Sequence, residues 1–511
     1  MANRAHITTA ITYSNGPPHV GHAYEYVATD TYVRHLRRRL GRENVTFVTG
    51  TDEHGDKNYR AAIAEGLEPK PFADKISAFF RAAHAGLNVS YDHFVRTTDP
   101  VHEKFVQKML QRARDNDEIY YKDYEGLYCI GCERFYTEKE LLPGNVCPAH
   151  NRPVELIKEG NYFLRLEKHR DEIREYVERP NFIRPERYRN EALNMLAQPI
   201  EDLCISRPKA RLDWGIELPF DTNYVTYVWY DAFWAYVSEL RDTSDAALTS
   251  ILPVTEHFIG KDILKTHAVY WPAMLIASGL PLYKSLNVHG WVNFGGERFS
   301  KSSGNIADPL EYEKTYGPDV LRYFFLRDAV YGLDVDFSDE RLIERYNADL
   351  ANDLGNLTSR VISMAQRYFA GEVKAAPGAN AEDRALGGVF ASIAERAGEF
   401  TGELAFNRAL EVIWQALDAA NKYVVATSPF TLAKDPANLP RVAEIIANLL
   451  EGLRVAADTL EPFMPITSRR ILELLAVDGA TVHAPFGKGL KPGHRVNAPI
   501  PLFPRIEKKR A

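Results

Sequence analysis

The pattern of hydrophobic and polar positions at the start of the chain predicts a strand, a helix and a second strand. Residues 4–13 (RAHITTAITY) form a short β-rich run that ends at the turn signal SNG, residues 14–16. Apolar residues then recur at intervals of three and four as far as Leu40, with arginines on the other faces, which is typical of an amphipathic helix. Gly41 ends this helix, and residues 44–55 (NVTFVTGTDEHG) bring a second apolar strand into a polar loop. Strand, helix and strand in this order build a parallel sheet.

The same order returns in the middle of the chain. Residues 256–263 and 285–292 are predicted to be strands, and residues 265–279 (KTHAVYWPAMLIASG) are predicted to be the crossover helix between them. The parallel sheet is therefore expected to be split by an insertion that runs from about residue 116 to about residue 225.

The C-terminal half has a helical pattern. From about residue 340 to Pro462 strand signals fade, and one apolar stripe has spacings of four and three along a single helix face. That stripe consists of Leu350, Leu354, Leu357, Val361, Met364 and Tyr368. The last 26 residues, from Phe486 on, are rich in proline, glycine and basic residues and are predicted to lie as a tail over the surface.

These patterns predict an α/β fold of the Rossmann type, a doubly wound parallel sheet split by an insertion and followed by an α-helical bundle. The expected domains are 1–115 (first half of the sheet domain), 116–225 (connective insertion), 226–325 (second half), 326–345 (stem-contact linker), 346–470 (helical domain) and 471–511 (tail packed on the body). A chain of 511 residues exceeds the roughly 250–300 residues that one hydrophobic core supports, so several domains are expected.

Composition and charge narrow the class of protein. No stretch approaches the roughly 18 consecutive apolar residues of a membrane span, and the first residues lack the apolar run of a secretory signal. We therefore expect a cytoplasmic protein with no membrane partner. The formal net charge of -7 means that a nucleic-acid partner would have to be bound by a local basic surface.

Three of the four cysteines lie between residues 129 and 147 and predict a metal site. Cys129 and Cys132 form one pair, and after fourteen residues Cys147 and His150 form another at the same spacing. Two such steps supply the four thiolate or imidazole ligands of a tetrahedral Zn²⁺ ion. Because all four ligands come from the protein, one structural zinc per chain is expected, and Cys204 is expected to be a buried apolar residue outside the set.

Two further segments have the chemistry of an anion site. His19 and His22 stand three apart at the start of the first helix, where metal ligands, ordinary helix-start residues and phosphate donors are all compatible with the spacing alone. Residues 295–305 (GGERFSKSSGN) follow a predicted strand and combine glycines, hydroxyls and an ammonium, although loops of this composition are also common on surfaces. Both segments leave strands at the carboxyl edge of the predicted sheet, where ligands of open α/β sheets bind.

Together these residues resemble the class I aminoacyl-tRNA synthetases, and among them the methionine-specific branch. His19-Val20-Gly21-His22 is similar to the HIGH signature of the family, and residues 298–302 (RFSKS) are similar to its KMSKS signature, with Arg for Lys and Phe for Met at the first two positions. The resemblance covers nearly the whole chain. It implies that L-methionine and ATP, with Mg²⁺, form methionyl-adenylate and diphosphate, and that the methionyl group then passes to methionine tRNA with release of AMP.

The resemblance also implies the site residues. A methionine pocket would be lined by Ile11, Tyr13, Asp52, Trp229, Ala232, Phe233, Tyr236, Ile263, His267 and Trp271. Its aromatic residues would recognise the thioether by shape and sulfur–aromatic contact, and Asp52 would bind the α-ammonium. ATP would be bound by His19, Gly21, His22, Asp262, His289, Gly290, Trp291, Val292, Ser300, Lys301 and Ser302, with His19, His22 and Lys301 as the catalytic donors. The anticodon would meet Asn356, Arg360 and Phe430.

Other classes of protein share part of this pattern. A synthetase for leucine, isoleucine or valine resembles it in both signatures but carries a larger editing insertion than the roughly 110 residues available here. The cysteine enzyme uses zinc in its active site, a small-molecule nucleotidyltransferase would leave the helical domain unexplained, and a non-catalytic tRNA-binding protein would not need both signature loops. A monomer is expected, because the chain ends without the C-terminal dimerising module that some family members carry.

Overall fold

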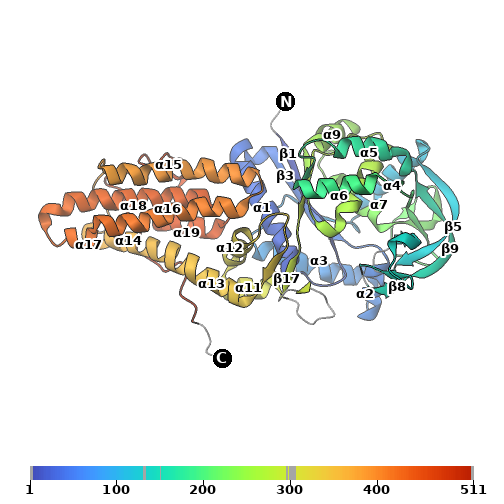
Figure 1. Cartoon of the computed structure of the whole chain (residues 1–511), viewed down its shortest axis with the longest axis horizontal. Coiled ribbons are helices and arrows are strands. Elements are labelled where there is room, and N and C mark those ends of the chain that lie inside the picture. Colours follow the sequence, from blue (N-terminus) through green and yellow to red (C-terminus); the bar gives the residue numbers. More distant parts are fainter. Residues whose placement is uncertain (1–3, 130–133, 150, 295–296, 299–306, 508–511) are drawn as a thin grey trace. The chain divides into compact units, whose positions relative to one another are not determined.

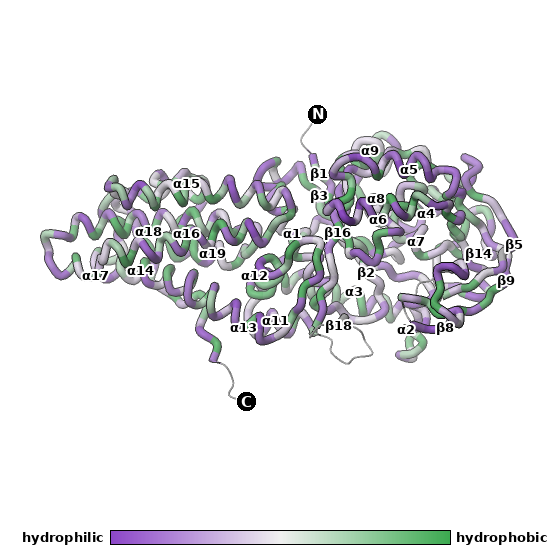
Figure 2. Tube along the Cα trace, viewed as in Figure 1, coloured by the Kyte–Doolittle hydropathy of each residue, from purple (hydrophilic) through white to green (hydrophobic). Residues whose placement is uncertain are grey.

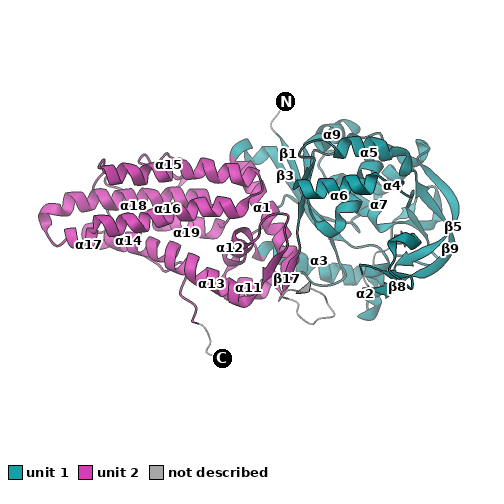
Figure 3. Cartoon of the chain, viewed as in Figure 1, with its two compact units in different colours: residues 1–19, 39–85, 90–290 teal, residues 20–38, 86–89, 291–511 magenta. Residues whose placement is uncertain are grey.

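The structure is a computed structural model that describes residues 4–129, 134–149, 151–294, 297–298 and 307–507. It divides into two compact units, which are coloured separately in Figure 3. The first comprises residues 1–19, 39–85 and 90–290, and the second comprises residues 20–38, 86–89 and 291–511. The unit boundaries differ from the domains expected from the sequence, because the first long helix and residues 291–325 group with the helical half.

The first unit is built on a seven-stranded parallel sheet. Its strands follow the spatial order β10, β16, β15, β1, β3 and β2, and β4 pairs with β3 as well. Every described ladder of this sheet is parallel. The strands are β1 (Ala5–Thr9), β2 (Thr12–Tyr13), β3 (Val45–Asp52), β4 (His93–Arg96), β10 (Ile183–Arg184), β15 (Thr255–Gly260) and β16 (Ser285–His289).

Besides this sheet the first unit contains helices, most of which are labelled in Figure 1. They are α2 (Asp56–Ala64), α3 (Pro69–Gly86), α4 (Pro100–Asp115), α5 (Arg170–Val177), α6 (Glu186–Leu196), α7 (Val228–Ala232), α8 (Ala235–Ser238), α9 (Asp245–Ile251) and α10 (Trp271–Ala277), with a π-helical turn η6 (Thr266–Tyr270) before α10. Short 3-10 turns are η1 (Arg42–Asn44), η2 (Glu138–Glu140), η3 (Glu167–His169), η4 (Leu252–Val254) and η5 (Lys261–Ile263). β1, β15 and β16 are buried along their whole length, so both of their faces lie in the interior.

The insertion predicted within the sheet domain is an antiparallel β region. Its long hairpin pairs β5 (Ile119–Cys129) with β9 (Glu155–Leu164), and β6 (Arg134–Tyr136) and β11 (Leu203–Cys204) extend it on either side. Smaller sheets join β7 (Val146–Cys147) to β8 (Arg152–Pro153) and β14 (Asp221–Thr226) to β12 (Ser206–Pro208) and β13 (Glu217–Leu218). The insertion also returns one short strand, β10, to the edge of the parallel sheet.

The second unit is largely helical, which confirms the predicted helical C-terminal half. It contains α1 (Val20–Leu40), α11 (Pro309–Tyr316), α12 (Pro318–Asp328), α13 (Asp339–Arg345), the π-helical segment η8 (Tyr346–Gly355), α14 (Asn356–Phe369), α15 (Ala381–Gly402), α16 (Phe406–Thr427), α17 (Pro429–Leu432), η9 (Pro436–Asn438), α18 (Leu439–Leu460), α19 (Pro465–Leu474) and α20 (Gly479–Val482). It also contains a small three-stranded sheet with the strand order β18 (Glu297–Arg298), β17 (Val292–Phe294) and β19 (Val335–Phe337).

Hydrophobic and hydrophilic residues alternate along α15, α16 and α18 in Figure 2, as expected for helices that bury one face. The apolar stripe predicted from the sequence is buried at Leu350, Leu354, Leu357, Val361 and Met364, while Tyr368 is half-buried. This stripe begins in η8 and continues in α14. None of the helices in the described residues is both long and apolar enough to cross a membrane.

Candidate active site

The carboxyl edge of the parallel sheet has a topological switch point beside β1. From β1 the chain passes to β3 on one side, while β15 and β16 lie on the other side. In open α/β sheets a ligand binds in the crevice outside the strand ends at such a point. Asp52 is the last residue of β3, Asp262 follows the end of β15, and His289 is the last residue of β16. The sheet therefore brings three of the predicted site residues to one edge.

An aromatic cluster lies beside this edge and contains most of the predicted methionine pocket. Phe233 is at its centre, stacked on Trp271 at a centroid distance of 5.5 Å and edge-on to His267 at 4.9 Å. Trp229 contacts Phe233 at 5.5 Å and Tyr13 at 6.1 Å. Phe233 and Trp271 are buried, whereas Tyr13 and Trp229 are half-buried, as are Ile11 and Ile263, which pack against the same core. The cluster thus has a closed inner end and a more open outer side.

Hydrogen bonds fix the protonation of His267 in this cluster. Its Nδ1 lies 2.9 Å from the carbonyl oxygen of Ile263, and its Nε2 lies 2.7 Å from the Tyr236 hydroxyl. A carbonyl oxygen only accepts, so Nδ1 carries the proton and Nε2 accepts from Tyr236 in the neutral ring. Burial lowers the pKa of His267 to about 4, against the opposing effects of the Ile263 carbonyl and Asp262. The pocket therefore presents an uncharged imidazole at neutral pH.

A second histidine, which the sequence analysis did not single out, supports the same wall. Trp271 donates its Nε1–H to Nε2 of His257 at 3.0 Å, and Nδ1 of His257 lies 2.7 Å from the Thr8 hydroxyl. Since the indole N–H only donates, Nδ1 of His257 must carry the proton. Burial holds the pKa of His257 well below its usual value, and the nearby His267 lowers it further.

Asp52 ends β3, and several hydrogen bonds fix it and the loop that follows it. Its backbone carbonyl accepts from the Ser14 N–H and from the Asn58 side chain, both at 2.9 Å. The next residue, Glu53, is fully buried and forms a bidentate pair with Arg96 at 2.7 and 2.9 Å. The Asp52 side chain itself is only 3% exposed. A carboxylate in this position has the chemistry to bind an ammonium group.

A glycine lets the side chains of Asp262 and His289 lie close to the end of β15. A Cβ at Gly260 would lie 2.7 Å from Oδ1 of Asp262 and 3.6 Å from Cε1 of His289, so a larger residue there would displace the aspartate. Gly260 and His289 are register partners in the sheet, and the side chain of Asp262 is exposed. The predicted ribose and adenine residues Asp262 and His289 are therefore neighbours. Of the remaining adenine residues, Gly290 ends the first unit, while Trp291 and Val292 begin the next segment of the second.

The HIGH-like turn lies at the start of α1. His19 immediately precedes the helix and His22 is its third residue, so both lie at the helix N-terminus, the end whose dipole favours an anion. The Val20 N–H donates to the carbonyl oxygen of Ala307 at 3.1 Å, so the chain that leaves the lysine-serine loop returns to the start of α1. α1 begins at Val20, so Pro17 and Pro18 belong to the segment before the helix.

Several predicted residues lie outside the described part of the chain. These are Ser300, Lys301 and Ser302 of the signature loop and the zinc ligands Cys132 and His150. The other two residues predicted to bind zinc, Cys129 and Cys147, are buried thiols in one small cluster with Tyr136, whose hydroxyl lies 3.5 Å from Sγ of Cys147. Within the described residues no group of three or more histidine, cysteine or acidic side chains is arranged to hold a metal ion. Cys204 is buried, as predicted.

The predicted anticodon residues lie on two helices of the second unit. Asn356 is exposed and Arg360 is half-buried on α14, one turn apart. Phe430 lies on α17 with 44% of its surface exposed, which leaves its ring accessible for stacking.

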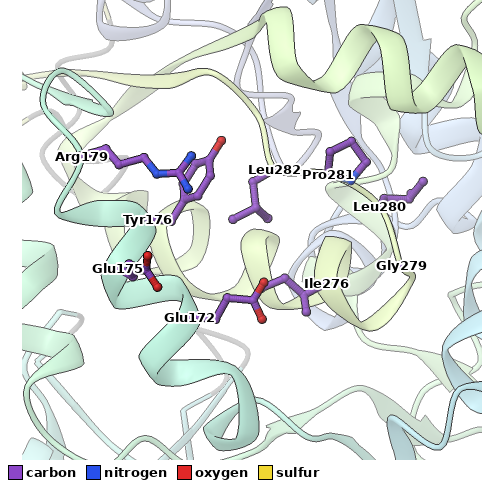
Figure 4. A pocket seen from close by; sticks show the side chains of 9 residues that line it. All are labelled: Glu172, Glu175, Tyr176, Arg179, Ile276, Gly279, Leu280, Pro281 and Leu282. Carbon is purple, nitrogen blue, oxygen red and sulfur yellow. The ribbon is translucent and has the colours of Figure 1, made fainter.

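A separate pocket of about 420 Å³ opens between α5 and the segment that follows α10 (Figure 4). Its polar side chains are Glu172, Glu175 and Arg179, and the Arg179 guanidinium lies 4.0 Å from the Tyr176 ring centroid. The other lining residues are Ile276, Gly279, Leu280, Pro281 and Leu282. No predicted site residue lines it, so it is distinct from the crevice beside β1.

The geometry also identifies site-supporting residues that sequence reasoning missed. His54, His102 and Asp231 form a buried network beside Asp52 and α7, and His257 supports Trp271. The polar run DEHG within an otherwise apolar strand end was a visible signal for His54. His102, Asp231 and His257 gave no such signal. An isolated histidine or aspartate in an apolar segment does not indicate which distant residue it contacts.

Comparison with known proteins supports one family. A family model described as "tRNA synthetases class I (M)" matches residues 5–153 and 146–362. The methionine--tRNA ligase of Caldanaerobacter subterraneus subsp. tengcongensis is 41% identical over 99% of this chain and 80% of its own length, and that of Deinococcus radiodurans is 42% identical over 98% and 74%. A solved structure of Mycobacterium tuberculosis methionyl-tRNA synthetase in complex with methionyl-adenylate aligns with a TM-score of 0.92 and 38% identity, over 98% of this chain and 99% of that one. The free form of that enzyme aligns with a TM-score of 0.86 and 34% identity, over 100% and 99%.

Proposed function

This chain belongs to the methionine-specific class I tRNA synthetases, and from that membership we infer which of its residues carry each step. It is a methionine--tRNA ligase, which joins L-methionine to its cognate tRNA at the expense of ATP through a methionyl-adenylate. The observation that carries the assignment of residues is the aromatic cluster beside Asp52 at the switch point of the sheet.

Methionine binds with its side chain among the aromatic rings and its α-ammonium at Asp52. The thioether has no charge and only a weak acceptor, so neutral rings suit it, and the uncharged His267 and the rings of Phe233 and Trp271 provide such a wall. A carboxylate that is 3% exposed gives a strong partner to the ammonium, because both charges are shielded from water. The other residues proposed to line the pocket are Ile11, Tyr13, Trp229, Ala232, Tyr236 and Ile263.

In the first step the methionine carboxylate oxygen attacks the α-phosphorus of ATP, the bond to the bridging oxygen breaks, and diphosphate leaves. Catalysis of such a transfer rests on positioning and on stabilising charge at phosphate oxygens. His19 and His22 donate to phosphate oxygens at the start of α1, and Lys301 binds the departing diphosphate. Asp262 binds the ribose beside Gly260, and residues 289–292 bind adenine. Mg²⁺ enters with ATP and is bound chiefly by phosphate oxygens.

In the second step a hydroxyl at the 3′ end of the tRNA attacks the carbonyl carbon of the adenylate, and AMP leaves. We infer that Asn356, Arg360 and Phe430 contact anticodon bases, which are unstacked in the loop and accessible to side chains. The exposed ring of Phe430 and the exposed amide of Asn356 support this assignment.

One structural zinc is proposed at Cys129, Cys132, Cys147 and His150. Burial of the two described thiols in one cluster of the insertion supports it, because Cys147 comes from a different hairpin than Cys129 and a shared ion would join the two. We also propose that the enzyme is a cytoplasmic monomer. Size-exclusion chromatography with light scattering tests the oligomeric state, and a monomer should have a mass near 57.9 kDa.

Exchange of label between diphosphate and ATP, measured with each of the twenty amino acids in turn, tests the reaction. We expect methionine alone to support exchange, since only the first step is needed and no tRNA is present. Strong exchange with a branched aliphatic amino acid and none with methionine would overturn the assignment of the pocket.

A further inference from the structure

Asp231 is a fully buried carboxylate that is shared by two histidines. Its Oδ2 lies 2.7 Å from Nδ1 of His54, and its Oδ1 lies 2.6 Å from Nε2 of His102. Nδ1 of His102 in turn lies 2.8 Å from the Ser238 hydroxyl. Because a carboxylate only accepts, both imidazoles donate to Asp231. Three segments far apart in the sequence, namely the end of β3, helix α4 and helix α7, are thereby joined at one carboxylate.

The network is adjacent in sequence to two segments of the proposed methionine pocket. His54 is two residues beyond Asp52, and Asp231 stands on α7 between Trp229 and Ala232. The loop that carries Asp52 and His54 is fixed on its other side by Glu53, which accepts from Arg96, from Thr98 at 2.5 Å and from Thr51 at 2.7 Å. Trp214 adds a hydrogen bond of 2.6 Å from its indole N–H to the Glu53 carbonyl. In this frame His54 is the side chain that connects the Asp52 loop to α7.

The charges around His54 favour its protonated form. Burial opposes a positive charge on the ring, but Asp231, Glu103 and Glu53 together outweigh it and raise the pKa of His54 above its ordinary value. Glu103 lies 3.9 Å from Nε2 of His54 and comes from α4, as does His102. The same imidazoles lower the pKa of Asp231, although burial alone would raise it.

We propose that the His54–Asp231–His102 network positions the Asp52 carboxylate against the α7 wall and thereby sets the affinity of the enzyme for methionine. The inference rests on the proposed pocket, and it gives His54 and His102 a role as positioning residues that touch no substrate. The ion pair between His54 and Asp231 is strongest when His54 is charged. Since the pKa of His54 in the folded protein is raised above about 6.5, this contribution is complete below that pH and is lost as pH rises through the raised value.

Kinetics of methionine-dependent exchange between diphosphate and ATP, from about pH 6 to about pH 9, test the proposal. In the unmodified enzyme the KM for methionine should increase across this range. His54→Ala should raise the KM about tenfold at the acid end and change kcat and the KM for ATP by less than about twofold, because affinity for the amino acid alone depends on the network. His54→Asn places an uncharged donor where Nδ1 stood, so it should recover most of the affinity lost in His54→Ala and show no increase of KM over the range in which His54 titrates.

A matched control is His84→Asn. His84 is also fully buried and also bonds through Nδ1, to the Phe80 carbonyl at 2.7 Å, so this substitution costs a similar amount of stability without touching Asp231. It should leave the KM for methionine and its pH profile unchanged.

Two results separate failure of this inference from failure of the pocket. If Asp52→Asn raises the KM for methionine but His54→Ala does not, or if His54→Asn keeps the full pH dependence, the network plays no part in affinity and the proposal is wrong. If Asp52→Asn also has no effect, the pocket itself is misassigned.

Discussion

At the scale of single residues, the crevice separates neutral from charged groups. The rings of His257 and His267 are uncharged at neutral pH, because burial lowers the pKa of both. His267 is part of the aromatic wall, and His257 supports the wall by accepting from Trp271. Asp52, by contrast, precedes Glu53, which pairs with Arg96, and lies two residues before His54, which pairs with Asp231 of α7. This division matches the two ends of methionine, an uncharged thioether and an α-ammonium.

The catalytic donors give the first prediction at this scale. His22→Ala and Lys301→Ala should each lower the rate of adenylate formation by about a hundredfold or more, which is the effect of removing one donor to a transition-state oxygen. Methionine-dependent exchange between diphosphate and ATP measures it directly. Lys57→Ala, which removes an ammonium 4.8 Å from the Tyr13 ring centroid, is a control for loss of a nearby cation and should have a much smaller effect. Undiminished exchange in both His22→Ala and Lys301→Ala would contradict the proposed roles.

Sequence reasoning proposed site residues whose motifs are local, and missed the supporting residues that are defined by a distant partner. The signature at His19 to His22 and the residues at the strand ends could be placed because a turn after a strand has a predictable position. Asp231 and His102 could not, since their relation depends on packing between α4 and α7, which are more than a hundred residues apart in the sequence. Asp52 was found while His54, two residues away, was not.

At the scale of elements, helix α18 shows how the C-terminal segment is attached. Glu451 and Arg454 are both buried on this helix and pair at 2.9 Å. Glu451 also accepts the backbone N–H groups of Gly487 at 2.6 Å and Leu490 at 2.5 Å, and Arg454 donates to the carbonyl of Val482 at 2.8 Å. The segment from residue 479 to residue 490 is therefore bound to α18 by backbone hydrogen bonds to charged side chains.

Glu451→Gln should lower the free energy of unfolding by about 3 kcal/mol or more, because it leaves Arg454 buried without its countercharge. Urea denaturation measures the change. Glu444→Gln is the matched control on the same helix: its partner is Arg441 at 3.0 Å, its side chain is 41% exposed, and its loss should cost less than about 1 kcal/mol. Equal losses of unfolding free energy in the two variants would show that the buried Glu451–Arg454 pair stabilises the protein no more than an exposed pair does.

The zinc site proposed in the insertion gives a prediction of its own. Elemental analysis of the purified enzyme should find one zinc per chain, and Cys147→Ala should remove it, because a tetrahedral site that lacks one of four ligands binds the ion far more weakly. Cys204→Ala is the control, since Cys204 is buried elsewhere, 3.7 Å from the Ser206 carbonyl oxygen, and should leave the zinc content unchanged. Retention of zinc by Cys147→Ala would exclude this ligand set.

At the scale of the whole molecule, the parallel sheet, its interruption by an insertion and the helical C-terminal half were all predicted from the sequence. These features could be predicted because buried strands and amphipathic helices have characteristic periods. Strand β10 was not predicted, because two residues carry no period, and its place at the sheet edge is set by pairing with β16. The crossover helix was predicted as one element, but it is a π-helical turn followed by α10, with Pro272 within the first turn of α10. Grouping of α1 with the helical half was also missed, since it depends on tertiary contacts.

The two units give a prediction that separates the two steps of the reaction. Arg360→Ala should raise the KM for tRNA in methionine transfer by about tenfold, because an anticodon contact is lost, and should leave exchange between diphosphate and ATP unchanged. Arg367→Ala is a matched control on α14, where the exposed guanidinium lies 5.7 Å from the Tyr368 ring centroid. Loss of exchange in Arg360→Ala would place the effect in folding and not in tRNA binding.

The sharing of Asp231 by His54 and His102 also has an evolutionary consequence. A substitution at position 231 alone would leave two buried imidazoles without this acceptor. A substitution at either histidine alone would remove one of the hydrogen bonds that stabilise the buried carboxylate. Across relatives, positions 54, 102 and 231 should therefore change together or not at all, even though neither histidine is expected to touch methionine or ATP.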